Sequence, residues 1–125
     1  MIINKLNDNF FFDFASCILG EDVSLYKQDL FIERNEDKVK LKVFLGGEME
    51  DGRTFQFKDN KCVFKHCGCL NQNATNLSYE WVSYLLECSE DLNDLEKQQI
   101  VEAYNKEIQK NIHDYALKQQ EKLII

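Results

Sequence analysis

The chain contains no proline and only five glycines among its 125 residues. Both residue types interrupt helices and strands, so their scarcity predicts regular secondary structure with few long linkers. No stretch approaches the ~20 apolar residues that a membrane-spanning helix requires. The first residues also lack the apolar segment of a secretory signal, and an acid, Asp8, follows soon after Met1. We therefore expect a soluble cytoplasmic protein without membrane contact, with residues 1–125 forming a single domain.

Basic residues are also scarce, because 15 lysines and arginines oppose 22 acids and leave a formal net charge of −7. Binding to duplex nucleic acid requires a basic surface that neutralises phosphates, so we expect no direct duplex binding. A protein partner with a basic surface is easier to reconcile with this charge, and so is mimicry of nucleic acid.

The five cysteines do not suggest a disulfide framework, because their number is odd and no signal segment precedes them. Cys62, His66, Cys67 and Cys69 are good zinc ligands by type, but their spacing matches no common zinc pattern. No spacing selects a cysteine–histidine pair for nucleophilic catalysis either. We expect no metal, no cofactor and no enzymatic activity. A zinc- or thiol-dependent enzyme built on these four residues is the alternative from another class.

Hydrophobic periodicity predicts a helix followed by a sheet. Apolar residues recur at nearly helical spacing over residues 2–19, and Gly20 is typical of the position after a helix. The aromatic run at residues 10–12 is also typical of a strand, which makes an extended second half the alternative. From about residue 23 to 69 the period changes to two, most clearly where Val39, Leu41 and Val43 alternate with lysines.

Four alternating runs, at residues 30–34, 39–45, 53–58 and 61–66, predict an antiparallel meander. Asp59 and Asn60 form a plausible two-residue hairpin turn. We interpret the polar residues 71–76 as a break that ends the sheet region. One face of the sheet is expected to be basic, from Lys38, Lys40, Lys42, Lys58 and Lys65.

Two further helices are predicted after the sheet. Leu77, Trp81 and Leu85 recur at helical spacing, which places Trp81 in the core. Asn93, followed by Glu96, has the pattern of a capping box and starts the last helix. The sequence thus predicts an α+β fold, with an antiparallel β-meander of about four strands packed by an N-terminal helix and two C-terminal helices.

The last helix could run from about residue 94 to 122, roughly 43 Å. A globule of this chain length spans only about 35 Å. The helix would therefore kink near His113, fray in its last turn, or pack on a second copy of the chain. Homodimerisation through the C-terminal helix is one of these three alternatives.

Acids are concentrated in residues 71–96, which hold six acids and no base. Helix dipoles favour acids at the start of a helix, which explains part of this run. The end of the preceding helix offers no such reason for Glu87 and Glu90. We therefore predict that this acidic strip binds a partner, with a plain solvated face as the alternative. Its residues are Glu80, Glu87, Glu90, Asp91, Asp94 and Glu96.

These features are typical of a small binding protein that inhibits or neutralises another protein. The leading hypothesis is a bacterial immunity protein that blocks a basic, nuclease-type toxin, since complementary charge speeds encounter with such a partner. A phage-encoded antagonist of a bacterial defence nuclease, acting as a nucleic-acid mimic, is the alternative. No sequence motif distinguishes the two.

Overall fold

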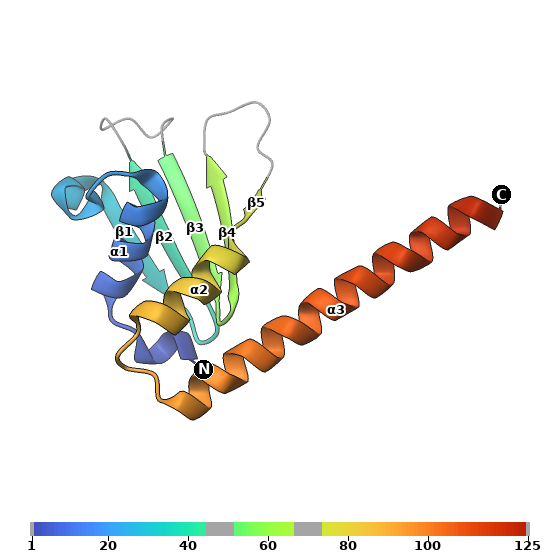
Figure 1. Cartoon of the computed structure of the whole chain (residues 1–125). Coiled ribbons are helices and arrows are strands. Elements are labelled where there is room, and N and C mark those ends of the chain that lie inside the picture. Colours follow the sequence, from blue (N-terminus) through green and yellow to red (C-terminus); the bar gives the residue numbers. More distant parts are fainter. Residues whose placement is uncertain (1, 45–51, 67–73, 125) are drawn as a thin grey trace.

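The computed structural model describes residues 2–44, 52–66 and 74–124. It confirms the α+β class, with an antiparallel sheet packed by an N-terminal helix and followed by two more helices (Figure 1). In chain order the elements are the 3-10 helix η1 (Ile2–Lys5), the helix α1 (Asp8–Leu19), the 3-10 helix η2 (Val23–Asp29), the strands β1 (Leu30–Arg34), β2 (Val39–Phe44), β3 (Gly52–Lys58), β4 (Lys61–His66) and β5 (Thr75–Asn76), and the helices α2 (Ser78–Cys88) and α3 (Asp94–Ile124).

The N-terminal segment is not the single helix predicted over residues 2–19, because it breaks between η1 and α1. The side chain of Asn7 accepts a hydrogen bond from the Phe10 amide at 3.0 Å and so starts α1 as a new helix. Arg34 of β1 stabilises this break, since its guanidinium donates to the Leu6 carbonyl at 2.9 Å and to the Asp8 carboxylate at 2.7 Å.

Helix α1 ends as the sequence predicts. Gly20 has a φ of 71°, a left-handed conformation that glycine adopts without strain, and its amide donates to the Ser16 carbonyl at 2.9 Å. Residues 10–12 lie within α1, so the extended alternative for them is wrong. Residues 23–29 are also not extended, because Asp22 accepts from the Ser24 amide and caps the short helix η2.

The sheet has the order β1-β2-β3-β4-β5, and every neighbouring pair is antiparallel. Leu41 lies opposite Ile32 on one side and Phe55 on the other. The Asp59–Asn60 turn is confirmed: β3 and β4 pair up to the residues that flank it, and Asp59 has a φ of 49°. The polar residues 71–76 do not simply end the sheet, because Thr75–Asn76 pair with β4 as a fifth strand.

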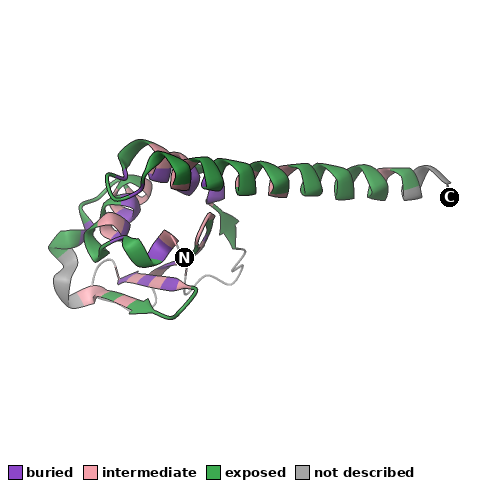
Figure 2. Ribbon diagram, turned by 90° about the horizontal axis from the view of Figure 1, so that it is seen from below, coloured by how far each residue is buried: buried purple, intermediate pink, exposed green. Residues whose placement is uncertain are grey.

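One large core fills the space between the sheet and helices α1 and α2 (Figure 2). Trp81 of α2 lies at its centre, fully buried as predicted. Its ring centroid is 4.6 Å from that of Phe57, 5.0 Å from Phe14 and 5.5 Å from Phe11. The indole N–H donates to the Asp59 carbonyl at 2.7 Å, so its polar atom is satisfied as well.

Helix α3 begins beside this core and then leaves it. Ile100 is buried and Tyr104 packs against the core, while Glu107 forms an ion pair with Lys61 at 3.2 Å. Beyond this point the helix continues without interruption at His113, so the predicted kink is wrong. Figures 1 and 2 show it extending straight away from the rest of the molecule.

Candidate partner-binding surface

Four acids of the predicted strip gather where the chain turns from α2 into α3. Glu87 lies in the last turn of α2, Glu90 and Asp91 lie in the connection, and Asp94 is the first residue of α3. All four are exposed. We call this group of four, at the lower edge of the molecule in Figure 1, the acidic corner.

None of the corner carboxylates forms an ion pair with a residue that the structure describes. The surrounding sequence offers no cation either, since residues 71–96 contain no lysine or arginine. A helix dipole favours Asp94 at the start of α3 but opposes Glu87 at the end of α2. Glu87 therefore costs the folded chain some stability, and no internal contact among the described residues offsets it.

The structure separates the other two predicted acids from the corner. Glu96 makes the capping box, because its carboxylate accepts from the Asn93 amide at 3.2 Å while its own amide donates to Asn93 Oδ1 at 2.8 Å. Lys5 also forms an ion pair with Glu96. These two contacts, that of Lys5 first, hold the pKa of Glu96 below its usual range. Its carboxylate is thus engaged within the chain.

Glu80 belongs to the first turn of α2, where the helix dipole favours an acid. Two helical turns separate it from Glu87, about 10 Å along the axis. Its charge contributes to the raised pKa of Tyr104, which comes first from burial of that hydroxyl. Glu80 therefore lies near α3 rather than in the acidic corner.

Ser89 is a buried polar residue within the acidic corner. It is only 4 % exposed, and its hydroxyl has no hydrogen-bond partner among the described residues. A buried hydroxyl without a partner normally lowers stability. The sequence pattern gave no sign of it, because serine is common in helix connections.

The cysteine–histidine alternative is only partly within the described residues, since Cys67 and Cys69 lie outside them. Cys62 is fully buried on the inner side of β4, and burial, followed by the nearby Glu80, raises the pKa of its thiol far above the ordinary value. A thiol in this state is a poor nucleophile and a poor metal ligand. Within the described ranges, no three cysteine, histidine or acidic side chains are placed to hold a metal ion.

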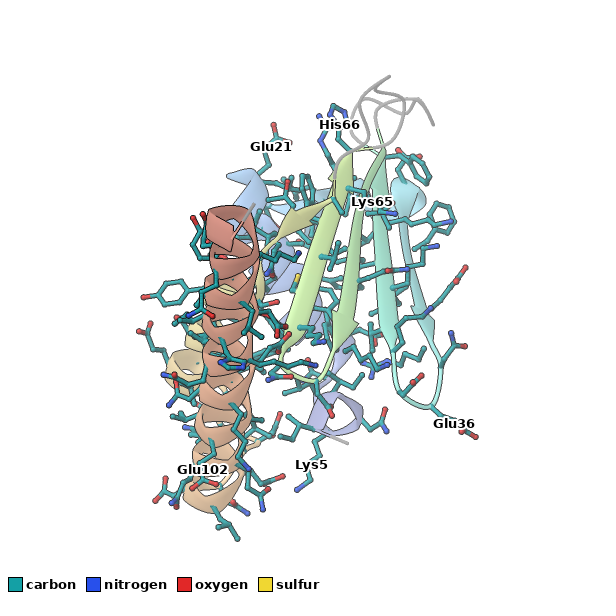
Figure 3. All side chains as sticks on the ribbon, turned by 90° about the vertical axis from the view of Figure 1, so that its right-hand side faces the viewer. Lys5, Glu21, Glu36, Lys65, His66 and Glu102 are labelled. Carbon is teal, nitrogen blue, oxygen red and sulfur yellow. The ribbon has the colours of Figure 1, made fainter. Side chains whose placement is uncertain are left out.

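The face of the sheet opposite α1 and α2 is a second exposed surface. No helix of the described chain covers it, as Figure 3 shows at the labelled Lys65. Strand alternation places Lys40, Lys42 and Lys65 on this face. Glu33 lies opposite Lys40 in the register, but none of the three lysines forms an ion pair with a described acid. Phe31, 51 % exposed, lines a shallow hollow there with Glu33, Lys42 and Phe44.

The basic sheet face predicted from the sequence is therefore present, although Lys58 is partly neutralised by Asp37 at 3.7 Å. Acidic and basic surfaces lie on different parts of the same domain. This polarity gives the molecule a defined orientation toward a charged partner.

Searches against models of protein families, against curated proteins and against solved structures find no match for this chain. Among the helices of residues 2–44, 52–66 and 74–124, none combines the length and the apolar character that a membrane crossing requires.

Proposed function

We propose that this chain is a small bacterial protein that binds and neutralises a basic partner, a nuclease-type toxin, by placing its acidic corner on the partner's cationic surface. The observation that carries the proposal is the group of four exposed carboxylates that has no cation partner within the described chain. Two of them, Glu87 and Glu90, have neither a helix-capping role nor a favourable helix dipole, so stability does not explain them.

The charge of the corner fits the chemistry of such a partner. A nuclease binds phosphates through lysines and arginines, and carboxylates at the ends of two helices can approach the same cations. Complementary charge would raise the association rate and suppress binding to acidic proteins. The corner belongs entirely to one chain, so a monomer suffices for this function.

Free thiols support a cytoplasmic site of action. Cys17, Cys62 and Cys88 form no disulfide with one another in the described part of the chain, and a reducing compartment keeps such thiols reduced. A cytoplasmic neutraliser would meet a nuclease before that nuclease reaches nucleic acid. We expect no direct binding to duplex DNA, because the net charge of −7 opposes it.

The experiment sequences the genes that flank the gene for this chain, co-expresses the chain with a basic nuclease that they encode, and measures cell survival and cleavage of plasmid DNA. Flanking genes without such a nuclease would count against the proposal. Replacement of Glu87, Glu90 and Asp91 by lysine should abolish protection and slow association by roughly 10–1000-fold at low salt. The matched control replaces Lys40, Lys42 and Lys65 of the sheet face by glutamate, which should leave protection intact.

Two further results would count against the proposal. If the wild-type chain neither binds nor inhibits the nuclease, the assigned class is wrong. If the sheet variant loses protection while the corner variant keeps it, the interface lies on the basic face instead. Circular dichroism of both variants shows whether each remains folded.

A further inference from the structure

The part of α3 that leaves the domain has no partner among the residues that the structure describes. Every residue from 109 to 118 is exposed, and these residues include Ile112 at 57 %, Tyr115 at 66 % and Leu117 at 45 %. We call residues 109–124 the projecting segment; it is about 24 Å long at 1.5 Å per residue. Helices in proteins gain most of their stability from packing of an apolar face. The exposed apolar side chains of this segment are therefore available to a binding surface.

The charges of residues 105–120 of α3 lie on one side. Lys106, Lys110, Asp114 and Lys118 follow one another at steps of four, which places them along one line of the helix. The opposite line consists of Ile108, Ile112, Tyr115 and Gln119, and the flanking positions carry only Asn105, Gln109, Asn111 and Ala116. We call this the uncharged face. It continues from Tyr104, which packs against the core.

The spacing of the uncharged face is the same in both directions. From Ile108 to Gln119 the steps are four, three and four residues, with the midpoint between residues 113 and 114. A second copy that runs antiparallel about this midpoint places Ile112 opposite the other copy's Tyr115, and Ile108 opposite the other copy's Gln119. Isologous pairing of two identical chains requires this kind of self-complementarity.

Charge selects the antiparallel orientation over the parallel one. Each chain carries a net charge of −7, but residues 104–120 hold three lysines against two acids. This segment is thus a place where two copies approach without repulsion between acids. Antiparallel pairing keeps the two acidic domains at opposite ends, with the two Glu107 positions about 20 Å apart along the axis. Parallel pairing would bring the two domains side by side.

We propose that a second copy of this chain covers the uncharged face of α3, forming an antiparallel helix pair with its two-fold axis between residues 113 and 114. The two acidic corners then lie about 60 Å apart along the pair, one at each end. Each corner stays accessible, so the dimer would carry two separate sites for the basic partner. This pairing does not depend on the proposed neutralisation of a toxin.

Sedimentation equilibrium of the full chain from about 5 to 300 µM tests the pairing. We expect a reversible monomer–dimer equilibrium in the micromolar range, as befits a small interface. Ile112→Asp buries a carboxylate in the uncharged face and should weaken the dimer at least about tenfold. The matched control is Leu117→Asp, which adds the same charge on the other side of the same helix and should change little.

A pair of charged variants tests the orientation. Ile112→Lys and Tyr115→Glu should each weaken self-association, whereas the double variant should recover it, because each lysine then meets a glutamate of the other copy. In a parallel pair the two lysines would face one another, and the double variant would stay weak. A full chain that is monomeric at 300 µM overturns the proposal, and a double variant without recovery overturns the antiparallel register.

Discussion

Helix α2 carries an acid near each end, and the two acids should affect stability in opposite directions. Glu80 lies in the first turn and Glu87 in the last turn, and no basic residue occupies that last turn. The positive end of the helix dipole stabilises the first acid, and the negative end repels the second. Each interaction amounts to about 0.3–1 kcal/mol at low ionic strength.

We therefore expect Glu87→Gln to raise the free energy of unfolding by about 0.3–1 kcal/mol and Glu80→Gln to lower it by a similar amount. Glutamine keeps the size and helix propensity of glutamate, so the comparison isolates charge. The difference between the two variants, about 0.6–2 kcal/mol, is measurable by urea unfolding when both have the same dependence on denaturant.

Salt supplies the internal control for this pair. At about 1 M salt the screening length falls to roughly 3 Å, so both differences should shrink toward zero. If Glu87→Gln destabilises the protein at low salt, as Glu80→Gln should, Glu87 has a structural role in α2. The case for a corner maintained for a partner would then lose its strongest residue.

Three further changes test the packing. Asn93→Ala should lower stability by about 1 kcal/mol in thermal or urea unfolding, because α3 loses the side chain that caps its amide at Glu96; an unchanged midpoint would contradict that role. Ser89→Ala should be neutral or stabilising, since it removes a buried hydroxyl that has no partner among the described residues, and a loss above about 1 kcal/mol would reveal a missed contact. Burial, with smaller contributions from Asp13 and nearby cysteines, raises the pKa of Tyr84 to about 12; unfolded tyrosine ionises near pH 10, so stability should fall as the pH rises from 10 to 12. The stability of a Tyr84→Phe variant should fall less over this pH range than that of the wild type. If both proteins lose the same stability between pH 10 and 12, burial of Tyr84 does not cause the loss.

Strand alternation was sufficient to predict most of the sheet. Val39, Leu41 and Val43 are all fully buried, and the lysines between them point to the other face. The pattern works because a strand places successive side chains on opposite sides, so one buried face leaves a period of two. Trp81 was predictable for the same kind of reason, since helical spacing aligned it with Leu77 and Leu85.

The elements missed by the sequence analysis depend on distant contacts. The break before α1 involves Arg34, which lies 28 residues from its partner Leu6. Apolar spacing continues through the break, so periodicity could not reveal it. The strand β5 has only two residues, and its position is set by pairing with β4 and by the Leu77 amide, which donates to the Cys62 carbonyl at 2.8 Å.

The predicted acidic strip shows the same limit at the level of function. Six acids within residues 80–96 looked like one surface, but Lys5, about 90 residues away in sequence, pairs with Glu96. Local sequence identified Glu96 correctly as a capping residue, and that role competes with partner binding. A local sequence pattern cannot show which distant cation the fold places beside an acid.

The two proposed interfaces differ in physical character, and this difference allows one measurement to separate them. The acidic corner acts through exposed charges, so its association with a basic protein should slow steeply as salt is added. The uncharged face of α3 buries isoleucine and tyrosine side chains, and burial of apolar surface is insensitive to moderate salt. Raising the salt concentration should therefore release the basic partner while the antiparallel pair persists. An α3 pair that dissociates in step with the partner would mean that charge, rather than the uncharged face, holds the two copies together.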